Sequence, residues 1–175
     1  LSKNCYNMGI KILPQDIITL MAAGEVIHRP ADVLKEFIEN ALDAKATSVT
    51  VDLMQGGCEK IKVSDNGSGI EYSQLELAIA PHATSKLSEL DGLQDMDTYG
   101  FRGEALHSIA HVSNFSLASR VPESEIGHQL SVCSPKREPS TDPLAMAQGT
   151  IVQANQLFAP YPVRRKFLKS PRLEL

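Results

Sequence analysis

The stretch Pro30-Ala31-Asp32-Val33-Leu34-Lys35-Glu36-Phe37-Ile38-Glu39-Asn40-Ala41-Leu42-Asp43-Ala44 decides how this sequence folds. Wound as an α-helix, it places its apolar residues on one half of the circumference and its polar residues on the other. The apolar half consists of Val33, Leu34, Phe37, Ile38, Ala41 and Leu42. Pro30 suits the first turn, because a proline there lacks only an N–H that has no helical partner. We predict an amphipathic helix that begins near Pro30 or Ala31 and ends near Ala44.

Two side chains on the polar half are spaced for joint chemistry. Glu36 and Asn40 are four residues apart, so their side chains meet one turn apart on the helix surface. A carboxylate beside a neutral amide forms no ion pair. It does suit Mg²⁺, which prefers oxygen ligands and needs few from the protein when phosphates supply others. Two interpretations stay open at this point: a metal and water site, or an ordinary solvated helix face.

Alternating residues after this helix predict a β-hairpin. Val49, Val51 and Leu53 fall on one face of a half-buried strand over 47–53, and Ile61 and Val63 point inward from a strand over 60–64. The turn between them is Gln55-Gly56-Gly57.

Similar patterns further along predict strands at 114–121, 126–132 and 150–154, helices at 15–23, 72–79, 104–111 and 164–169, and a long surface loop at 134–148. Antiparallel strands with helices between them are typical of an α+β domain. We expect a two-layer sandwich, in which helices cover one face of a mixed, mostly antiparallel sheet.

The second strand of the hairpin runs into a loop, Asp65-Asn66-Gly67-Ser68-Gly69. The sequence contains neither the common phosphate-binding loop nor the dinucleotide-binding glycine pattern, since Tyr72 stands where the third glycine would be. The loop is either a simple turn or a close backbone approach to a flat ligand, in which Asp65 accepts a hydrogen bond from an exocyclic amine. Gly100-Phe101-Arg102-Gly103 precedes a predicted helix, where backbone N–H groups favour phosphate; a plain connector is the alternative.

The composition excludes several classes of protein. Apolar residues make up 42% and charged residues 22%, so the chain can bury a core and is not disordered as a whole. A net charge of −4 excludes a uniformly basic coat, and four Tyr, five Phe and no Trp argue against base stacking as the main activity. No stretch reaches the roughly 20 apolar residues of a membrane span, and no secretory signal is visible.

The cysteines and histidines form no obvious constellation. Cys5, Cys58 and Cys133 lie far apart, which argues against a disulfide framework or a cysteine zinc site and favours a reducing compartment. His107 and His111 share a helix face but have no evident third ligand, so we interpret them as surface or core histidines.

Four segments occur together and in order: Ala22–Ile27 with Arg29-Pro30, Lys35–Ala44, Asp65–Ile70 and Gly100–Leu106, with His82–Lys86 between the last two. Together they resemble the N-terminal ATPase domain of the MutL DNA mismatch-repair family, over residues 10 to about 170. Gyrase-type topoisomerases, the ninety-kilodalton heat-shock chaperone and sensor histidine kinases share only part of the set. The resemblance implies the Bergerat, or GHKL, ATP-binding fold.

The resemblance also implies a role for each matching residue. Glu36 would be the general base for the attacking water, and Asn40 would hold Mg²⁺. Asp65 would bind the adenine amino group, with Gly67 and Gly69 leaving room for the base and Thr84 supporting Asp65. The remaining nucleotide-binding residues would be Gly100, Phe101, Arg102, Gly103, Glu104, Ala105 and Leu106, and the part from Arg102 onward would form a lid around the phosphates. ATP and Mg²⁺ are the implied cofactors.

The family comparison also sets the expected domain organisation. Residues 1–9 would be a tail, 10–170 the ATP-binding domain and 171–175 the start of a connection to a second domain, which in the family supplies a lysine to the γ-phosphate. We therefore expect slow or incomplete ATP hydrolysis by this chain. Pro81 and the segment Ala159-Pro160-Tyr161 depart from the family pattern.

The implied function is to couple mismatch recognition to strand removal through ATP-driven lid closure and dimerisation. Expected partners are a MutS-type mismatch-recognition protein, DNA bound weakly and without sequence specificity, and another MutL-type chain, but no membrane. The location would be cytoplasmic in a bacterium or nuclear in a eukaryote. A nucleotide-binding interaction module without turnover is the alternative, and a histidine kinase ATP domain is a remote third.

The basic residues near the end of the chain, Arg164, Arg165, Lys166, Lys169 and Arg172, leave three interpretations open. They could contact DNA phosphates, form a solvated helix end, or pack on a further domain.

Overall fold

The computed structural model describes residues 26–83, 103–133, 139–159, 161–166 and 168. Within these residues the helices are α2 (Pro30–Asp43), α3 (Leu75–Ala78), α4 (Ala105–Val112) and α5 (Pro162–Lys166), with short 3-10 turns η1 (Gln55–Gly57) and η2 (Tyr72–Gln74). The strands are β1 (Val49–Met54), β2 (Lys60–Asp65), β3 (Asn114–Arg120), β4 (Gly127–Val132), β5 (Ser140–Leu144) and β6 (Gly149–Asn155). No helix of this described part is long and apolar enough to cross a membrane.

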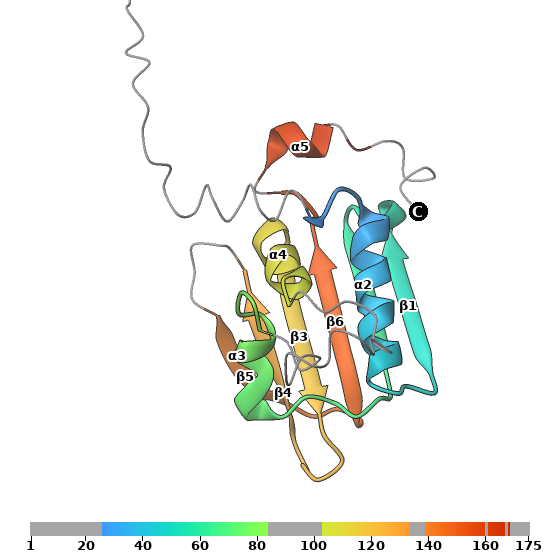
Figure 1. The fold of residues 1–175 in the computed structure, drawn as a ribbon, viewed down its shortest axis with the longest axis vertical. Helices are drawn as coiled ribbons and strands as arrows, with labels where there is room; N and C mark the ends of the chain where they lie inside the picture. The colour runs from blue at the N-terminus through green and yellow to red at the C-terminus, as the bar shows by residue number, and fades with distance from the viewer. Residues whose placement is uncertain (1–25, 84–102, 134–138, 160, 167, 169–175) are drawn as a thin grey trace, which may run out of the picture.

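The strands form one sheet of six in the order β1-β2-β6-β3-β4-β5 (Figure 1). Every pairing among the described strands is antiparallel. β6, which comes last in the chain, lies between β2 and β3 and so joins the early hairpin to the later strands. The α+β class predicted from the sequence is confirmed.

The register places apolar residues in rows across the sheet. Val63, Val152, Leu117 and Leu130 form one row, and Ile61, Ala154, Phe115 and Val132 form the next. All eight are buried. Residues directly opposite one another share a face of the sheet, so these two rows form the floor of the core.

Helices α2 and α4 lie over one face of the sheet (Figure 1). α2 buries Val33, Phe37 and Ala41 from the predicted apolar half, and the Phe37 ring lies 6.5 Å from that of Phe115 on β3. α4 adds Ile109 and Val112 to the same core. The helix predicted from the opening stretch therefore has the expected bounds and buries most of the expected face, but Leu42 near its end is 49% exposed.

Some local predictions were wrong. The long loop predicted over 134–148 contains β5, which pairs with the outer edge of β4. Pro143 can occupy this strand because an edge strand has one side without a partner that needs its N–H. Val51 is 41% exposed, since β1 is the other edge strand and α2 lies over β2 rather than over β1.

Other predicted elements have shifted bounds or lie outside the described residues. The helix predicted over 72–79 divides into η2 and α3, and the final basic helix begins earlier, as α5. The tail and the helix predicted over 15–23 are outside the described residues.

Candidate functional site

The apolar face of the sheet becomes polar at the end where β2 finishes. One register step beyond Val63, the row across the sheet consists of Asp65, Thr150, Ser119 and His128. These residues are on the same face as the core rows because side chains alternate along each strand. A polar row that continues an apolar floor is the feature from which the site is built.

Asp65 is half-buried at the end of β2. Its Oδ1 accepts a hydrogen bond from the N–H of Gly67 at 2.8 Å, and its carboxyl group also accepts one from the Thr150 backbone. Burial raises the pKa of Asp65 above its ordinary value, and the two backbone hydrogen bonds partly oppose this rise. The structure thus holds a carboxylate where its charge is costly, which is a common property of binding sites.

The two glycines after Asp65 are required by close backbone contacts. A Cβ on Gly67 would lie 2.7 Å from both the Cβ and the carbonyl oxygen of Ala44. Gly69 has a φ of +76°, and a Cβ there would lie 2.4 Å from the carbonyl oxygen of Arg120. The loop is therefore pressed against the end of α2 on one side and the end of β3 on the other.

Hydrogen bonds join this loop to the segment after α2. The Ser68 N–H donates to the Ala44 carbonyl at 3.0 Å. The Asn66 Oδ1 accepts from the N–H groups of Thr47 and Ser48 at 2.9 and 2.8 Å, and its Nδ2 donates to the Thr47 Oγ1 at 2.8 Å. The loop that carries Asp65 is consequently fixed relative to α2.

Glu36 and Asn40 lie one turn apart on α2, and both are half-buried. Neighbouring Glu39 instead forms an ion pair with Lys35, with 3.1 Å between its Oε1 and the lysine Nζ. The structure thus separates the two acidic side chains of the motif: Glu39 pairs with a cation on its own helix, and Glu36 is on the stripe that also carries Asn40.

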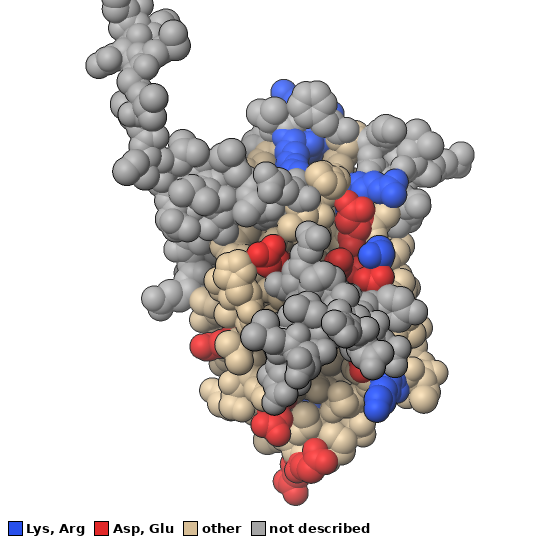
Figure 2. All heavy atoms as spheres, in the orientation of Figure 1, with Lys and Arg blue, Asp and Glu red and all other residues tan. Residues whose placement is uncertain are grey.

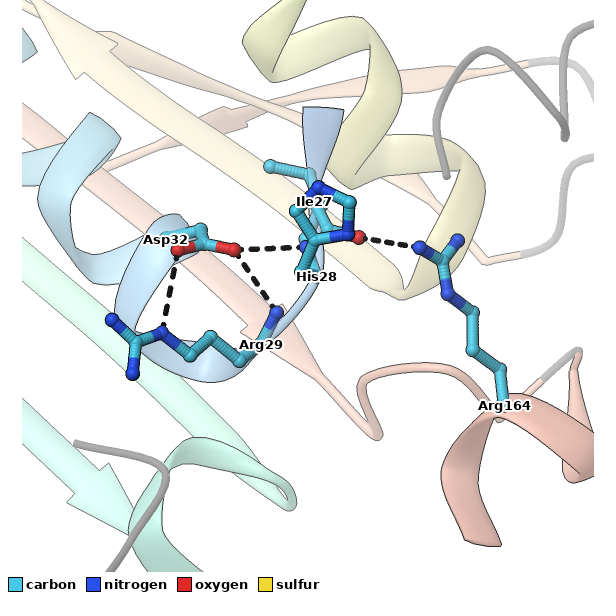
Figure 3. Close-up of polar contacts among 5 residues, drawn as sticks. All are labelled: Ile27, His28, Arg29, Asp32 and Arg164. Atoms are coloured by element: carbon cyan, nitrogen blue, oxygen red, sulfur yellow. Dashed lines mark hydrogen bonds and ion pairs between the residues drawn. The ribbon is translucent and has the colours of Figure 1, made fainter. Parts of the chain in front are cut away.

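The start of α2 is fixed by contacts with two segments (Figure 3). The Asp32 Oδ2 accepts from the backbone N–H groups of His28 and Arg29 at 2.8 and 3.1 Å. From α5, the Arg164 Nη2 donates to the Ile27 carbonyl at 2.9 Å, and its guanidinium lies 5.0 Å from the centre of the Phe158 ring. Both ends of the helix that carries Glu36 and Asn40 are therefore held.

The contacts of α5 bear on the basic cluster near the end of the chain. Arg165 forms an ion pair with Glu59, so both Arg164 and Arg165 make contacts within this domain. On the face drawn in Figure 2, basic side chains gather at the end occupied by α5 with acidic side chains close beside them, and further acidic side chains lie at the tip of the β3–β4 connection. Lys169 and Arg172 lie outside the described residues.

The predicted lid lies only partly within the described structure. Gly103, Glu104, Ala105 and Leu106 are described, whereas Thr84, Gly100, Phe101 and Arg102 are not. A Cβ on Gly103 would lie 2.4 Å from the Ala83 carbonyl oxygen, and the Glu104 carboxylate lies 3.1 Å from the His82 Nδ1. Ala105 and Leu106 begin α4. The two chain segments that flank residues 84–102 therefore meet at the N-terminus of α4.

Two polar residues beside Asp65 were missed by the sequence analysis. The Ser119 Oγ donates to the Gly149 carbonyl at 2.9 Å, lies 3.0 Å from the Thr150 Oγ1 and accepts from the Ile70 N–H at 2.8 Å. Thr150 supports Asp65 through its backbone, the role that the family resemblance assigned to Thr84. The alternation along the strands could have identified them, because Ser119 and Thr150 occupy the inward positions next to Leu117 and Val152.

The two histidines of α4 form hydrogen bonds with backbone carbonyl groups of the fold. The Nδ1 of His107 lies 3.0 Å from the Ile79 carbonyl oxygen, and that of His111 lies 2.9 Å from the His107 carbonyl oxygen. Burial lowers the pKa of His107, which favours its neutral form. In the described part of the chain no three His, Cys, Asp or Glu side chains are grouped so as to hold a metal ion.

Comparison with known proteins decides the family. Residues 28–148 match the family model described as histidine kinase-, DNA gyrase B-, and HSP90-like ATPase. The chain belongs to this ATPase family. The match includes α2 and the Asp65 loop, and the identity of the family agrees with the resemblance that the motifs indicated.

Individual relatives of this ATPase chain are mismatch-repair proteins. The chain is 51% identical to the DNA mismatch repair protein MutL of Xanthomonas campestris over 168 residues, which cover 96% of this chain and 27% of that protein. It is 47% identical to MutL of Coxiella burnetii over 167 residues, which cover 95% of this chain and 29% of that protein. The chain thus spans little more than a quarter of the length of these relatives.

Solved structures agree with these sequence matches. The ATPase domain of Aquifex aeolicus MutL, complexed with ADP, has a TM-score of 0.65 and 36% identity, and the match covers 85% of this chain and 51% of that one. The N-terminal domain of a DNA repair protein has a TM-score of 0.68 and 30% identity, covering 85% of this chain and 42% of that one. The ATPase fold of this chain is therefore the one found in MutL ATPase domains.

Proposed function

We propose that this chain binds ATP with Mg²⁺ and hydrolyses it slowly, as the ATPase part of a MutL-type mismatch-repair protein. The observation that carries the proposal is the half-buried carboxylate of Asp65, held on a loop that packs against the end of α2 at Gly67 and against the end of β3 at Gly69. The same helix presents Glu36 and Asn40 one turn apart. The similarity to an ADP-bound MutL ATPase domain supports this assignment.

The adenine would bind beside Asp65. An exocyclic amino group donates hydrogen bonds, and the Asp65 carboxylate is an acceptor whose Oδ1 is already oriented by the Gly67 N–H. Gly67 and Gly69 let the loop lie close against Ala44 and the end of β3, and this packing positions Asp65 for the base. The phosphates would then extend toward the polar stripe of α2 and the N-terminus of α4, where Gly103, Glu104, Ala105 and Leu106 lie and where Gly100, Phe101 and Arg102 would complete the lid.

The residues of α2 suit an Mg²⁺ ion that takes few of its ligands from the protein. The described residues group no three acidic or histidine ligands, so the protein would contribute the Asn40 amide oxygen and the nucleotide its phosphates. Bound there, Mg²⁺ would offset the negative charge of the phosphates during transfer. Glu36, one turn away on the same stripe, would orient the attacking water and accept its proton.

Thermal melting with Mg²⁺ and a non-hydrolysable ATP analogue tests nucleotide binding. A ligand at 100 times its dissociation constant stabilises a protein by about 2.7 kcal/mol. For a chain of this size we therefore expect the Tm to rise by roughly 5–11 °C. The rise should depend on Mg²⁺ and should be smaller in Asn40→Ala, because that variant lacks the proposed metal ligand.

Phosphate release tests hydrolysis separately. Glu36→Gln should abolish release from ATP and leave the analogue-induced rise in Tm in place. Glu39→Gln is the matched control, since it changes an acidic residue of the same helix that pairs with Lys35, and its release rate should equal that of the unmodified chain. Equal release by Glu36→Gln would contradict the assigned base, and a rise in Tm without any release would indicate a nucleotide-binding module.

The similarity to MutL proteins supports a biological role for the complete protein. We propose that nucleotide-driven lid closure and dimerisation in the complete protein couple mismatch recognition by a MutS-type protein to strand removal, with weak, non-specific DNA binding. The domain would extend over 10–170, preceded by the tail 1–9 and followed at 171–175 by the connection to a further domain. The location would be cytoplasmic or nuclear according to the organism.

A further inference from the structure

Ser119 is a polar side chain inside the apolar part of β3. It is 2% exposed, while the inward positions before it are the buried residues Phe115 and Leu117. Its hydroxyl has three partners from segments far away in the chain: the Ile70 N–H at 2.8 Å, the Gly149 carbonyl at 2.9 Å and the Thr150 Oγ1 at 3.0 Å. Burying a hydroxyl group costs free energy unless its hydrogen bonds are made inside the protein. The three contacts of Ser119 therefore have to satisfy its donor and its two lone pairs.

The donors and acceptors can be assigned by counting. A serine hydroxyl has one proton to donate and two lone pairs that accept. The Ile70 N–H can only donate, so it uses one lone pair, and the Gly149 carbonyl can only accept, so it takes the proton. The one remaining role for Ser119 is to accept through its second lone pair. The Thr150 hydroxyl must therefore donate its proton to Ser119.

This assignment fixes what Thr150 offers to a ligand. With its only proton directed at Ser119, the Thr150 Oγ1 has lone pairs and no donor left for other partners. Thr150 lies directly opposite Asp65 in the β2–β6 register and on the same face. The adjacent Asp65 carboxylate accepts hydrogen bonds as well. The two half-buried side chains at this end of the sheet therefore present acceptors only.

We infer that Ser119 is a specificity-determining residue, which orients the Thr150 hydroxyl so that the site accepts a purine with a 6-amino group and rejects one with a 6-oxo group. A 6-amino group donates hydrogen bonds and matches two acceptors, whereas a 6-oxo group is itself an acceptor and would face two others. Ser119 acts through Thr150 and does not itself touch the base. The inference rests on the proposed nucleotide site and extends it.

The test compares two non-hydrolysable probes that differ at this position, the β,γ-imido analogues of ATP and of inosine triphosphate, by titration calorimetry on the full chain. The measured quantity is the ratio of the two dissociation constants. Ser119→Ala releases the Thr150 hydroxyl, which can then donate to a 6-oxo group. Since one hydrogen bond contributes about 0.5–1.5 kcal/mol, we expect the preference for the ATP analogue to fall by roughly 3- to 10-fold.

A second variant keeps the test independent of the stability of Ser119→Ala. Thr150→Val removes the hydroxyl at a half-buried position and retains the shape of the side chain. If the Thr150 oxygen acts as an acceptor, this variant weakens binding of the ATP analogue more than binding of the inosine analogue. If the hydroxyl instead donates to the base, the inosine analogue is weakened more, and the inference is overturned.

The double variant tests whether the two residues act together. With Thr150→Val in place, Ser119→Ala should leave the ratio unchanged, because the hydroxyl that it orients is absent. Ser116→Ala is the matched control, since Ser116 is on the same strand but on the opposite face, and it should not alter the ratio.

Two results overturn the inference in distinguishable ways. A parallel loss of affinity for both probes in Ser119→Ala would show that Ser119 only supports the loop. If the unmodified chain bound neither probe, the proposed function itself would fail, and the inference with it.

Discussion

The two ends of β2 are stabilised in different ways. At its first residue, Lys60 reaches across to Asp52 on β1, and nearby Arg165 pairs with Glu59. These are long, charged side chains that stay partly in solvent. At its last residue, Asp65 accepts from the backbone of Gly67 and Thr150, and the following loop forms hydrogen bonds with Ser119, Ser48 and Ala44.

The difference indicates at which end of β2 the residues must keep fixed positions. Exposed ion pairs contribute little and tolerate movement, because water and salt screen them. Hydrogen bonds between short side chains and backbone groups fix positions, and a buried group that loses its partner is costly. The contacts at the start of β2 thus allow its residues to move, whereas those at its end hold the candidate site in a fixed geometry. Three substitutions test this contrast.

Gly69→Ala should have the largest effect. The change forces a side chain onto a φ of +76° and brings its Cβ to 2.4 Å from the Arg120 carbonyl oxygen. We expect a loss of about 3 kcal/mol in the free energy of unfolding, most of it from the backbone contact. Differential scanning calorimetry should show the Tm falling by roughly 6–12 °C.

The matched control for that change is Gly56→Ala, in the β1–β2 turn at the opposite end of the hairpin. Gly56 also has a positive φ, of 60°. The cost should be about 1 kcal/mol, the penalty of the left-handed conformation alone. Equal losses for the two variants would mean that the site end of β2 is no more rigid than the far end.

Asn66→Ala should have an intermediate effect. It removes the acceptor of the Thr47 and Ser48 N–H groups, which joins the Asp65 loop to the segment after α2. We expect a loss of about 1–2 kcal/mol by urea denaturation. Asn66→Asp should recover most of it, because a carboxylate accepts both N–H groups and the Thr47 hydroxyl can turn to donate.

A far-end comparison sharpens this result. Asn155 accepts from the Gln153 Nε2 two residues away on β6, and both side chains are half-buried. This bond joins no two segments of the fold, so Asn155→Ala should cost less than about 0.5 kcal/mol. If Asn66→Asp is as unstable as Asn66→Ala, the amide donation to Thr47, rather than the pair of accepted bonds, holds the loop.

Asp52→Asn should have the smallest effect. The hydrogen bond and charge of Lys60 lower the pKa of Asp52 below its ordinary 3.8. The stabilisation from such a lowered pKa is present above 3.8 and is lost as the pH falls through the folded-state value. We expect the Tm of the variant to be lower by about 1–2 °C at pH 7, and less in high salt.

Melting curves as a function of pH provide the check. The difference between Asp52→Asn and the unmodified chain should shrink as the pH falls below 3.8 and should vanish below the lowered folded-state pKa of Asp52, where both side chains are uncharged. A difference that persists at low pH would show that the contact is not an ion pair and that the two ends of β2 are more alike than the structure indicates.

Much of the fold could be predicted from local patterns. The apolar half of Pro30–Asp43 fixed the bounds and the buried face of α2, and alternation located β2, β3, β4 and β6 within one or two residues. The edge strands of the sheet were less predictable. β5 carries Pro143 and few apolar residues, so its strand conformation comes from pairing with β4 rather than from its own pattern.

Family motifs, in contrast, supplied most of the candidate site. The spacing of Glu36 and Asn40 and the glycine loop after Asp65 each left a plain structural interpretation open, and the family motifs assigned their expected roles. Ser119 and Thr150 were not identified, since nothing local distinguishes an inward serine in β3 or an inward threonine in β6 from an ordinary strand residue. They become part of a site only because β6 lies between β2 and β3 and brings three segments into register.

Local patterns were sufficient to predict the helix that carries Glu36 and Asn40, the glycine loop after Asp65 and the α+β class, because each pattern involves residues close together in the chain. The three-dimensional fold was needed to show that the apolar floor of the sheet ends in a polar row, and which hydroxyl donates to which group. Those properties depend on strand order and register, which join residues separated by 31 and 49 positions.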